Sequence, residues 1–197
     1  MKKFLFVALL LISVSGFAQR FQLGVKGGMN ISNFVGDNYE DSKYEARIGY
    51  NVGAFVGFYF GNHFSLQPEA LFSTQGTGIK DLSTGEKHDF NLNYLTIPVM
   101  AKFEFNGGFY LETGPEAGIN VSSAQFENQK VKDITKNSDF AWGFGLGYHA
   151  PFGLGIGARY NVGLSKVADS NFENPDYRNS VAQIGLFYTF FNNHMHR

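Results

Sequence analysis

Eight charged residues at alternating positions in apolar segments are the clearest candidates for a chemical role in this sequence. They share a parity with glycine and small polar residues, while apolar residues occupy the positions between them. Because four are positive and four negative, they could pair with one another in a shared interior. The set is Lys26, Arg47, Glu69, Lys102, Glu104, Glu112, Glu116 and Arg159. Two roles are open for it, a salt-bridged plug or the lining of a narrow ion path.

Motifs for catalysis, nucleotide binding or metal binding are weak. The segment "GFGLG", residues 143–147, resembles a phosphate-binding loop only in its glycines, because no helical pattern follows it. No hydroxyl or carboxylate can be named as a catalytic partner for His149. His194 and His196 would make at most a weak metal site at the chain end. We therefore expect no enzymatic activity, no cofactor and no metal.

The composition favours strands and turns. The 197 residues include 24 Gly, 22 Phe and 10 Tyr, with no Cys. Apolar residues alternate with polar or small ones along eight segments, which we predict to be strands. They cover residues 21–32, 47–60, 64–75, 90–105, 109–121, 140–150, 152–166 and 181–191. A net charge of −1 offers no basic surface for nucleic acid.

The fourth predicted strand changes parity part way along. Phe90, Leu92 and Tyr94 share one parity, whereas the apolar residues from Leu95 onward share the other. We expect either a β-bulge near Tyr94 or a strand that begins there. Pro98 removes a backbone donor from the same strand, which agrees with a local irregularity.

The connections between the predicted strands alternate in length. Long ones at 33–46, 76–89, 122–139 and 167–180 are separated by short ones at 61–63, 106–108 and 151–153. Short periplasmic turns and long extracellular loops are typical of bacterial outer-membrane barrels, which have an even number of antiparallel strands. The predicted fold is therefore all-β: an eight-stranded, antiparallel, up-and-down transmembrane barrel formed by residues 19–197.

A soluble lipocalin-like barrel that binds a ligand would also alternate. Two features favour the membrane barrel: the apolar faces carry almost no charge, and aromatic residues gather beside the short turns, where barrels meet the membrane interface. This predicted aromatic collar comprises Phe58, Phe60, Phe64, Phe103, Phe105, Phe109, Tyr148, Phe152 and Phe190. The eight charges then face a lumen just wide enough for side chains.

Glycines in the sixth and seventh strands share the inward parity. They are Gly143, Gly145, Gly147, Gly155 and Gly157. Glycine normally weakens a strand, so we expect these five to leave room for long charged side chains from other strands.

The N-terminus has the pattern of an export signal. Two lysines precede an apolar stretch of residues 4–14, and small residues follow up to Ala18. We predict a cleaved signal peptide in residues 1–18, because the apolar stretch is too short to span a membrane.

Three segments resemble the PorT-like outer-membrane β-barrel proteins of the Bacteroidetes. They are "LNYLTIPVMAKFEF" at residues 92–105, "FYLETGPEAGI" at 109–119 and "GARYNVGLSKV" at 157–167. The last strand resembles the signal read by the barrel-assembly machinery, with Gln183, Gly185, Tyr188 and Phe190 at the matching positions. The resemblance implies a place in the cell outer membrane, contact with its lipid, and assembly by that machinery.

These features predict a structural or interaction protein whose long loops engage an extracellular protein or a surface glycan. Tyr39, Tyr44, Phe126 and Tyr177 lie among polar residues in the predicted loops and could make such contacts. The second hypothesis is a minor pore or, as the PorT-like resemblance implies, an accessory to protein secretion.

Overall fold

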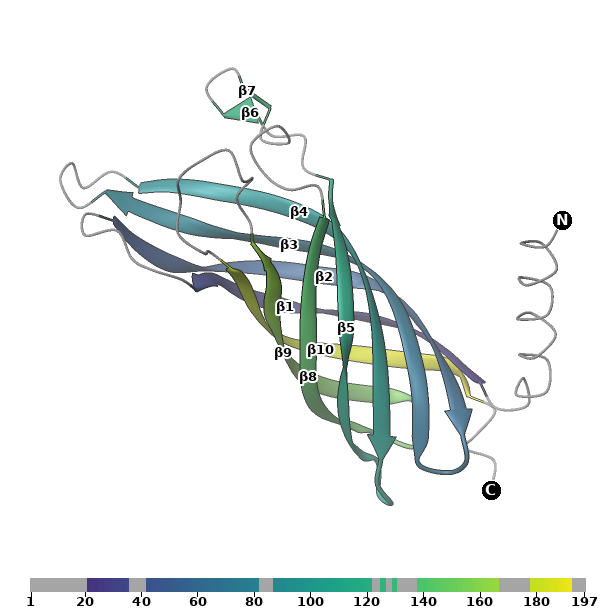
Figure 1. Cartoon of the computed structure of the whole chain (residues 1–197). Coiled ribbons are helices and arrows are strands. Elements are labelled where there is room, and N and C mark those ends of the chain that lie inside the picture. The colour runs from purple at the N-terminus through teal and green to yellow at the C-terminus, as the bar shows by residue number, and fades with distance from the viewer. Residues whose placement is uncertain are drawn as a thin grey trace, which may run out of the picture.

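Eight long strands close into an antiparallel barrel in the computed structural model (Figure 1). The structure describes residues 21–35, 42–81, 87–121, 125–126, 129–130, 138–166 and 178–192. The barrel strands are β1 (Phe21–Val35), β2 (Ser42–Phe60), β3 (Phe64–Asp81), β4 (Lys87–Glu104), β5 (Phe109–Asn120), β8 (Ser138–His149), β9 (Leu154–Lys166) and β10 (Arg178–Asn192). The pair β6 (Gln125–Phe126) and β7 (Gln129–Lys130) forms a separate small sheet.

Consecutive barrel strands are neighbours, and β1 closes the ring against β10. Gly28 of β1 lies opposite Gly185 of β10, and on its other side opposite Asn51 of β2. This meander, which leaves no sheet edge along the closed part of the barrel, confirms the predicted fold class.

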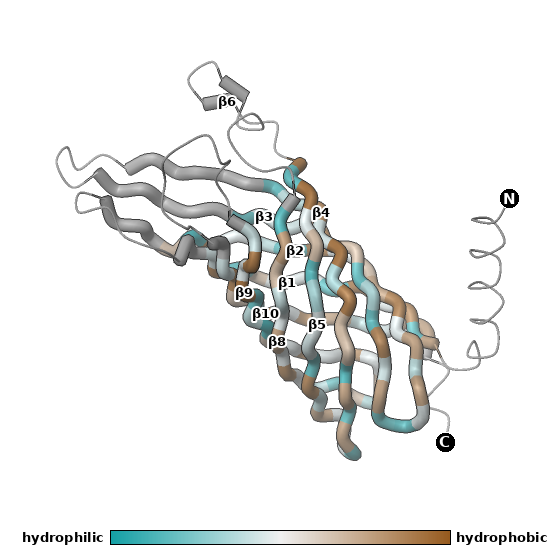
Figure 2. Tube along the Cα trace, in the orientation of Figure 1, coloured by the Kyte–Doolittle hydropathy of each residue, from teal (hydrophilic) through white to brown (hydrophobic). Residues whose placement is uncertain are grey.

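Hydrophilic and hydrophobic residues alternate along the barrel strands (Figure 2). The exposed side chains of the described strands are mostly apolar, and most of the buried ones are polar or charged. Along β5 every second residue is buried. Large apolar side chains such as Ile48, Phe144 and Ile184 are more than half exposed, whereas Glu69 and Arg159 are buried. A soluble barrel would place its charged residues outside instead, so the exposed apolar surface is suited to lipid.

Three tight turns join the strands at one end of the barrel. Gly61, Gly107 and Gly153 have positive φ angles of 80°, 99° and 93°, which glycine adopts without strain. Figure 1 shows the start of β1 and the end of β10 at this same end. In outer-membrane barrels it is the short turns that face the periplasm.

The predicted aromatic collar lies on the outer surface beside these turns. All of its members except Phe58 are at least 40% exposed, and Phe58 is partly exposed. Neighbouring rings contact one another, as in Phe103 and Phe105 with centroids 5.1 Å apart. Phe191 extends the collar by stacking on Phe21 at 4.8 Å.

Both alternatives predicted for the fourth strand are wrong, since β4 has no bulge near Tyr94 and begins at Lys87. β4 pairs with β3 in one register from Lys87 to Phe103, and the register is the same on both sides of Pro98. Tyr94 instead points inward and is buried, beside Gly118 of β5. An aromatic residue at an inward position therefore explains the parity change without a bulge.

The long connections are shorter than predicted, because parts of them are strand. Residues 42–46, 76–81 and 87–89 extend β2, β3 and β4. The β3–β4 pairing reaches Lys80 and Lys87, whereas β5 leaves β4 at the pair Tyr94 and Asn120. These three strands therefore project beyond their neighbours as a sheet, as Figure 1 shows.

Several predictions concern residues outside those that the structure describes. They include the signal peptide in residues 1–18 and the terminal residues His194 and His196. Within the described ranges, no helix is both long and apolar enough to cross a membrane.

Candidate functional site: the polar interior of the barrel

An ion-pair cluster of three side chains occupies the middle of the interior. Arg159 on β9 binds Glu69 on β3 with two parallel hydrogen bonds, from Nη1 at 2.9 Å and from Nη2 at 2.8 Å. Its Nε donates to Oε1 of Glu112 on β5 at 2.7 Å. The planar guanidinium fits this geometry because it presents several donors in a fixed fork. All three side chains are at most 5% exposed, so their charges are balanced by one another rather than by water.

Lys26 on β1 adds a second cation to this cluster. Its Nζ lies 3.1 Å from Oε2 and 3.2 Å from Oε1 of Glu69. Gln67, two residues earlier on the same strand face, donates to Glu69 Oε1 at 2.9 Å. Two cations and two carboxylates from four strands are thus joined into one network across the lumen.

Aromatic rings, rather than a carboxylate, hold the ammonium of Lys102. Nζ lies 3.6 Å from the ring centroid of Tyr110 and 5.0 Å from that of Phe187. Phe187 also packs edge-on against Phe55, with centroids 5.9 Å apart. These side chains are buried, and contact of a cation with aromatic faces is favourable when water is excluded. Since Tyr110 lies two residues nearer the short turn than Glu112, the rings close the lumen on that side of the ion pairs.

Hydrogen bonds continue the packing toward the short turns. Tyr59 donates to Gln22 Oε1 at 2.9 Å, and Gln22 Nε2 donates to Gln67 Oε1 at 3.2 Å. The Tyr59 hydroxyl also lies 3.4 Å from Glu104, whose carboxylate is 3.9 Å from Nδ1 of the buried His149. A polar chain therefore connects the short-turn end of the barrel to the ion pairs.

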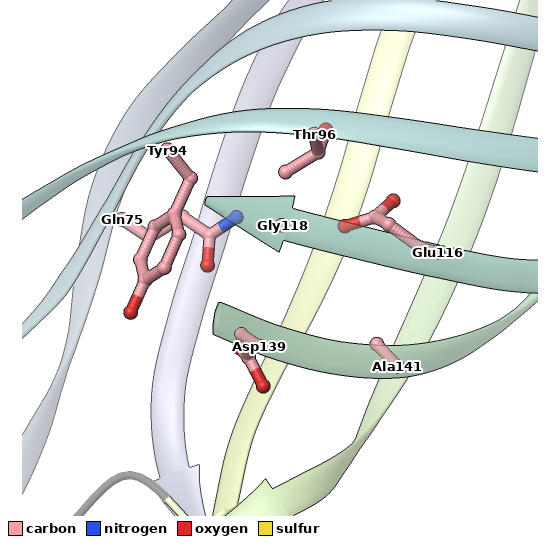
Figure 3. A pocket seen from close by; sticks show the side chains of 7 residues that line it. All are labelled: Gln75, Tyr94, Thr96, Glu116, Gly118, Asp139 and Ala141. Carbon is pink, nitrogen blue, oxygen red and sulfur yellow. The ribbon is translucent and has the colours of Figure 1, made fainter. Parts of the chain in front are cut away.

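The half of the interior toward the long loops is also polar. Asn161 donates to Glu116 Oε2 at 3.0 Å, while Asn30 and Gln75 both donate to the Ser73 hydroxyl, at 2.9 and 3.0 Å. A cavity of about 10 Å³ lies beside Glu116 (Figure 3). Its lining is Gln75, Tyr94, Thr96, Glu116, Gly118, Asp139 and Ala141.

A second cavity of about 30 Å³ lies beside Lys26, Tyr110 and Arg159. One water molecule needs roughly 10–15 Å³ measured in this way. These two cavities are thus large enough for only a few water molecules.

The structure brings four of the eight predicted lumen charges into direct contact, Lys26, Glu69, Glu112 and Arg159. Three others lie in the same interior with different partners. Lys102 contacts Tyr110, Glu104 contacts Tyr59 and Glu116 contacts Asn161. Arg47 lies near the long-loop end of β2, opposite Ser32, and in the described residues no ion pair joins it to the other seven.

Sequence reasoning did not assign a role to several interior side chains. Phe55, Gln67, Leu71, Met100 and Phe187 are all buried. Four of them share their parity with a predicted lumen charge on the same strand, as Met100 does with Lys102, and Phe187 shares the parity of the buried Gln183. Parity could therefore have placed these side chains in the interior.

The residues of the predicted assembly signal lie on the two faces of β10. Gln183 is buried in the interior, Gly185 lies opposite Gly157 of β9, and Tyr188 and Phe190 are exposed on the outer surface. Recognition of these residues by the assembly machinery stays a prediction.

No group of three or more His, Asp or Glu side chains suited to a metal ion occurs among the residues described.

A family model for the outer membrane protein beta-barrel domain matches residues 17–169. No curated protein sequence gives a significant match.

Solved outer-membrane barrels share the fold at low sequence identity. Ail, the attachment invasion locus protein of Yersinia pestis, is 18% identical with a TM-score of 0.53, over 87% of this chain and 99% of Ail. Neisserial surface protein A is 14% identical with a TM-score of 0.54, over 85% and 97%. OprG from Pseudomonas aeruginosa is 14% identical with a TM-score of 0.50, over 86% and 95%.

Proposed function

Because this chain belongs to the outer membrane protein beta-barrel domain family, we propose that it is a sealed barrel that presents its long-loop end to molecules outside the cell. The family and the fold place it in the cell outer membrane. In this proposal the protein acts by binding and by structural support, and it catalyses no reaction.

The observation that carries the proposal is the filled interior. Arg159, Glu69 and Glu112 occupy the middle of the lumen, and Tyr110 and Phe187 pack on their periplasmic side. Desolvated ion pairs of this kind are costly to open, because separating them leaves buried charges without partners. A sealed lumen leaves the extracellular end as the part of the barrel that can act on other molecules.

A minor pore is the competing function, and the charged interior is the feature that favours it. Ion-conducting barrels keep a continuous aqueous channel, whereas the cavities here measure about 10 and 30 Å³. A role in protein secretion rests on the PorT-like resemblance of residues 92–105, 109–119 and 157–167. It is compatible with a sealed barrel, since an accessory protein needs a binding surface rather than a channel.

Protease treatment of intact cells tests the display of the long-loop end. Trypsin should cleave only at sites on that side, within residues 43–47, 80–87 and 130–136 and at Arg178. Lys102 and Arg159 should stay uncut, because both are buried in the lumen. Mass spectrometry of the released and retained peptides would identify the sites, and cleavage at Lys102 or Arg159 would overturn the topology.

Chymotrypsin provides the matched control for the periplasmic end. Phe152 lies in a short turn and is 70% exposed. It should be protected in intact cells and cleaved once the outer membrane is disrupted. Cleavage at Phe152 in intact cells would show that the short turns, not the long loops, face outward.

A further inference from the structure

The edge of β4 beyond the end of β5 has no neighbouring strand among the described residues. β4 begins at Lys87, but its pairing with β5 begins only at Tyr94. Among the described residues, the bond from Val121 N to Asn93 O, at 2.8 Å, is the backbone hydrogen bond nearest this end of β4 on that side. β6 and β7 pair with each other and with no strand of the barrel. Residues 87–92 therefore belong to a sheet edge that projects from the barrel rim.

The direction of the backbone groups along this edge follows from the strand geometry. Successive residues of a strand direct their N–H and C=O groups to opposite sides. Asn93 O accepts from Val121 N, directly after β5, and Glu104 N donates to His63 O, directly before β3, so odd-numbered residues face the β5 side. The β3–β4 register is unshifted from Lys87 onward, so the same parity holds along the whole strand. The N–H and C=O groups of Lys87, Asp89 and Asn91 thus point away from β3.

The opposite edge of the projecting sheet is less regular. β2 also extends beyond β1, since their pairing ends at Ser32 and Arg47. The register between β2 and β3 shifts between Ala46 and Asn51, however. A shift of this kind twists a strand and disturbs its hydrogen-bonding groups, which protects an edge from further pairing. β4 carries no such irregularity.

We propose that the β4 edge at residues 87–92 is a docking site for an extended segment of an extracellular polypeptide, which joins the sheet as an additional strand. This inference rests on the proposed display of the long-loop end. An unshifted row of alternating backbone donors and acceptors is complementary to another strand about 4.8 Å away, and the main chain supplies the affinity in such additions. A glycan does not carry this repeating backbone pattern.

A second copy of this chain fits the edge less well. Copies in one membrane run β4 in the same direction, from the extracellular end toward the short turns. They could therefore pair only as parallel strands, which are less stable per residue than antiparallel ones. A segment of a different protein can approach in either direction.

The test removes one backbone donor from the edge and keeps the rest of the sheet. Asp89→Pro deletes an N–H on the open side and puts the proline ring where an added strand would lie, and proline is tolerated at such edges. Asp89→Ala removes the same side chain but keeps the N–H. Ten-residue peptides displayed on phage would be selected on the mature barrel in lipid nanodiscs and then measured on both variants. Because the heat-dependent gel shift reports the closed barrel, it would verify that both variants fold.

We expect the selected peptides to bind Asp89→Pro at least about tenfold more weakly than wild type, and Asp89→Ala within about twofold. Equal binding to Asp89→Pro, or no selectable peptide, would overturn the inference. A wild-type dimer that Asp89→Pro dissolves would also overturn it, by assigning the edge to a second copy. None of these outcomes changes the protease pattern in intact cells, which tests display of the long-loop end separately.

Discussion

The guanidinium of Arg159 joins charged side chains of the interior into one network. Arg159 binds carboxylates on two other strands, and one of them, Glu69, also binds Lys26. Arginine suits this position because its fork can satisfy both carboxylates, whereas a lysine ammonium is a point charge. The network stabilises the closed barrel only while all of its members are present.

Arg159→Ala should lower the free energy of unfolding by about 3–5 kcal/mol, because Glu69 and Glu112 lose a buried counter-charge. Leu154→Ala, on the lipid-facing surface of the same strand, should cost less. Urea unfolding of each variant refolded into lipid vesicles measures both losses. A loss for Arg159→Ala equal to or smaller than that for Leu154→Ala would contradict a stabilising ion-pair plug.

Parity could predict which charged residues face the lumen, but not how they pair. Glu69 and Arg159 are 90 positions apart and come from β3 and β9, which are not neighbours in the sheet. Their contact depends on strand stagger around the barrel, which alternation in one strand does not encode. Within the paired strands β4 and β5, Lys102 lies directly opposite Glu112, so the sequence could not distinguish its contact with Tyr110 from a salt bridge.

At the scale of elements, the hairpin of β8 and β9 explains the glycine-rich sequence. Its inward glycines leave space that side chains from other strands occupy. A Cβ on Gly145 would lie 2.7 Å from Glu112 Oε1, and one on Gly157 would lie 2.5 Å from the Tyr110 hydroxyl. A Cβ on Gly155 would overlap the ring of Phe187. Aromatic rings occupy this space, in addition to the charged side chains that were predicted to lie there.

Gly145→Leu and Gly155→Leu should each hinder folding, because their side chains would meet Glu112 and Phe187. Gly27→Ala is the matched control, since a Cβ there has only one ordinary contact, at 3.6 Å from Asn51 O. The folded fraction after dilution from urea into detergent, read from the gel shift on heating, measures the effect. Normal folding of both leucine variants would argue against a filled lumen.

The residues at which strands end were harder to predict than the presence of the strands. Residues 77–81 and 87–89 contain Gly, Lys and Asp, which are typical of loops, yet they form strand. β3 is paired on both sides here, to Ser42 through Asp81 and to Lys87 through Lys80. Tertiary pairing therefore overrides local propensity at this end, and a single segment contains no signal of its partner's length.

At the scale of the whole molecule, the architecture was predictable and the interior packing was not. Even strand number, alternating connection lengths and charge-free apolar faces together indicated a closed membrane barrel. Whether such a barrel conducts depends on how side chains meet across the lumen, as Tyr110, Phe187 and Lys102 do. Lys102 and Tyr110 come from the paired strands β4 and β5, but Phe187 comes from β10, which only the closed fold brings to them.

Conductance of the purified barrel in planar lipid bilayers shows whether its interior is sealed. The variant Tyr110→Ala/Phe187→Ala/Arg159→Ala removes the three largest groups around the second cavity and serves as the matched opened barrel. We predict that wild-type protein, reconstituted at the same protein-to-lipid ratio, gives no channel steps, while the opened variant conducts. Steady, reproducible channels from the wild-type barrel would show that its interior is open.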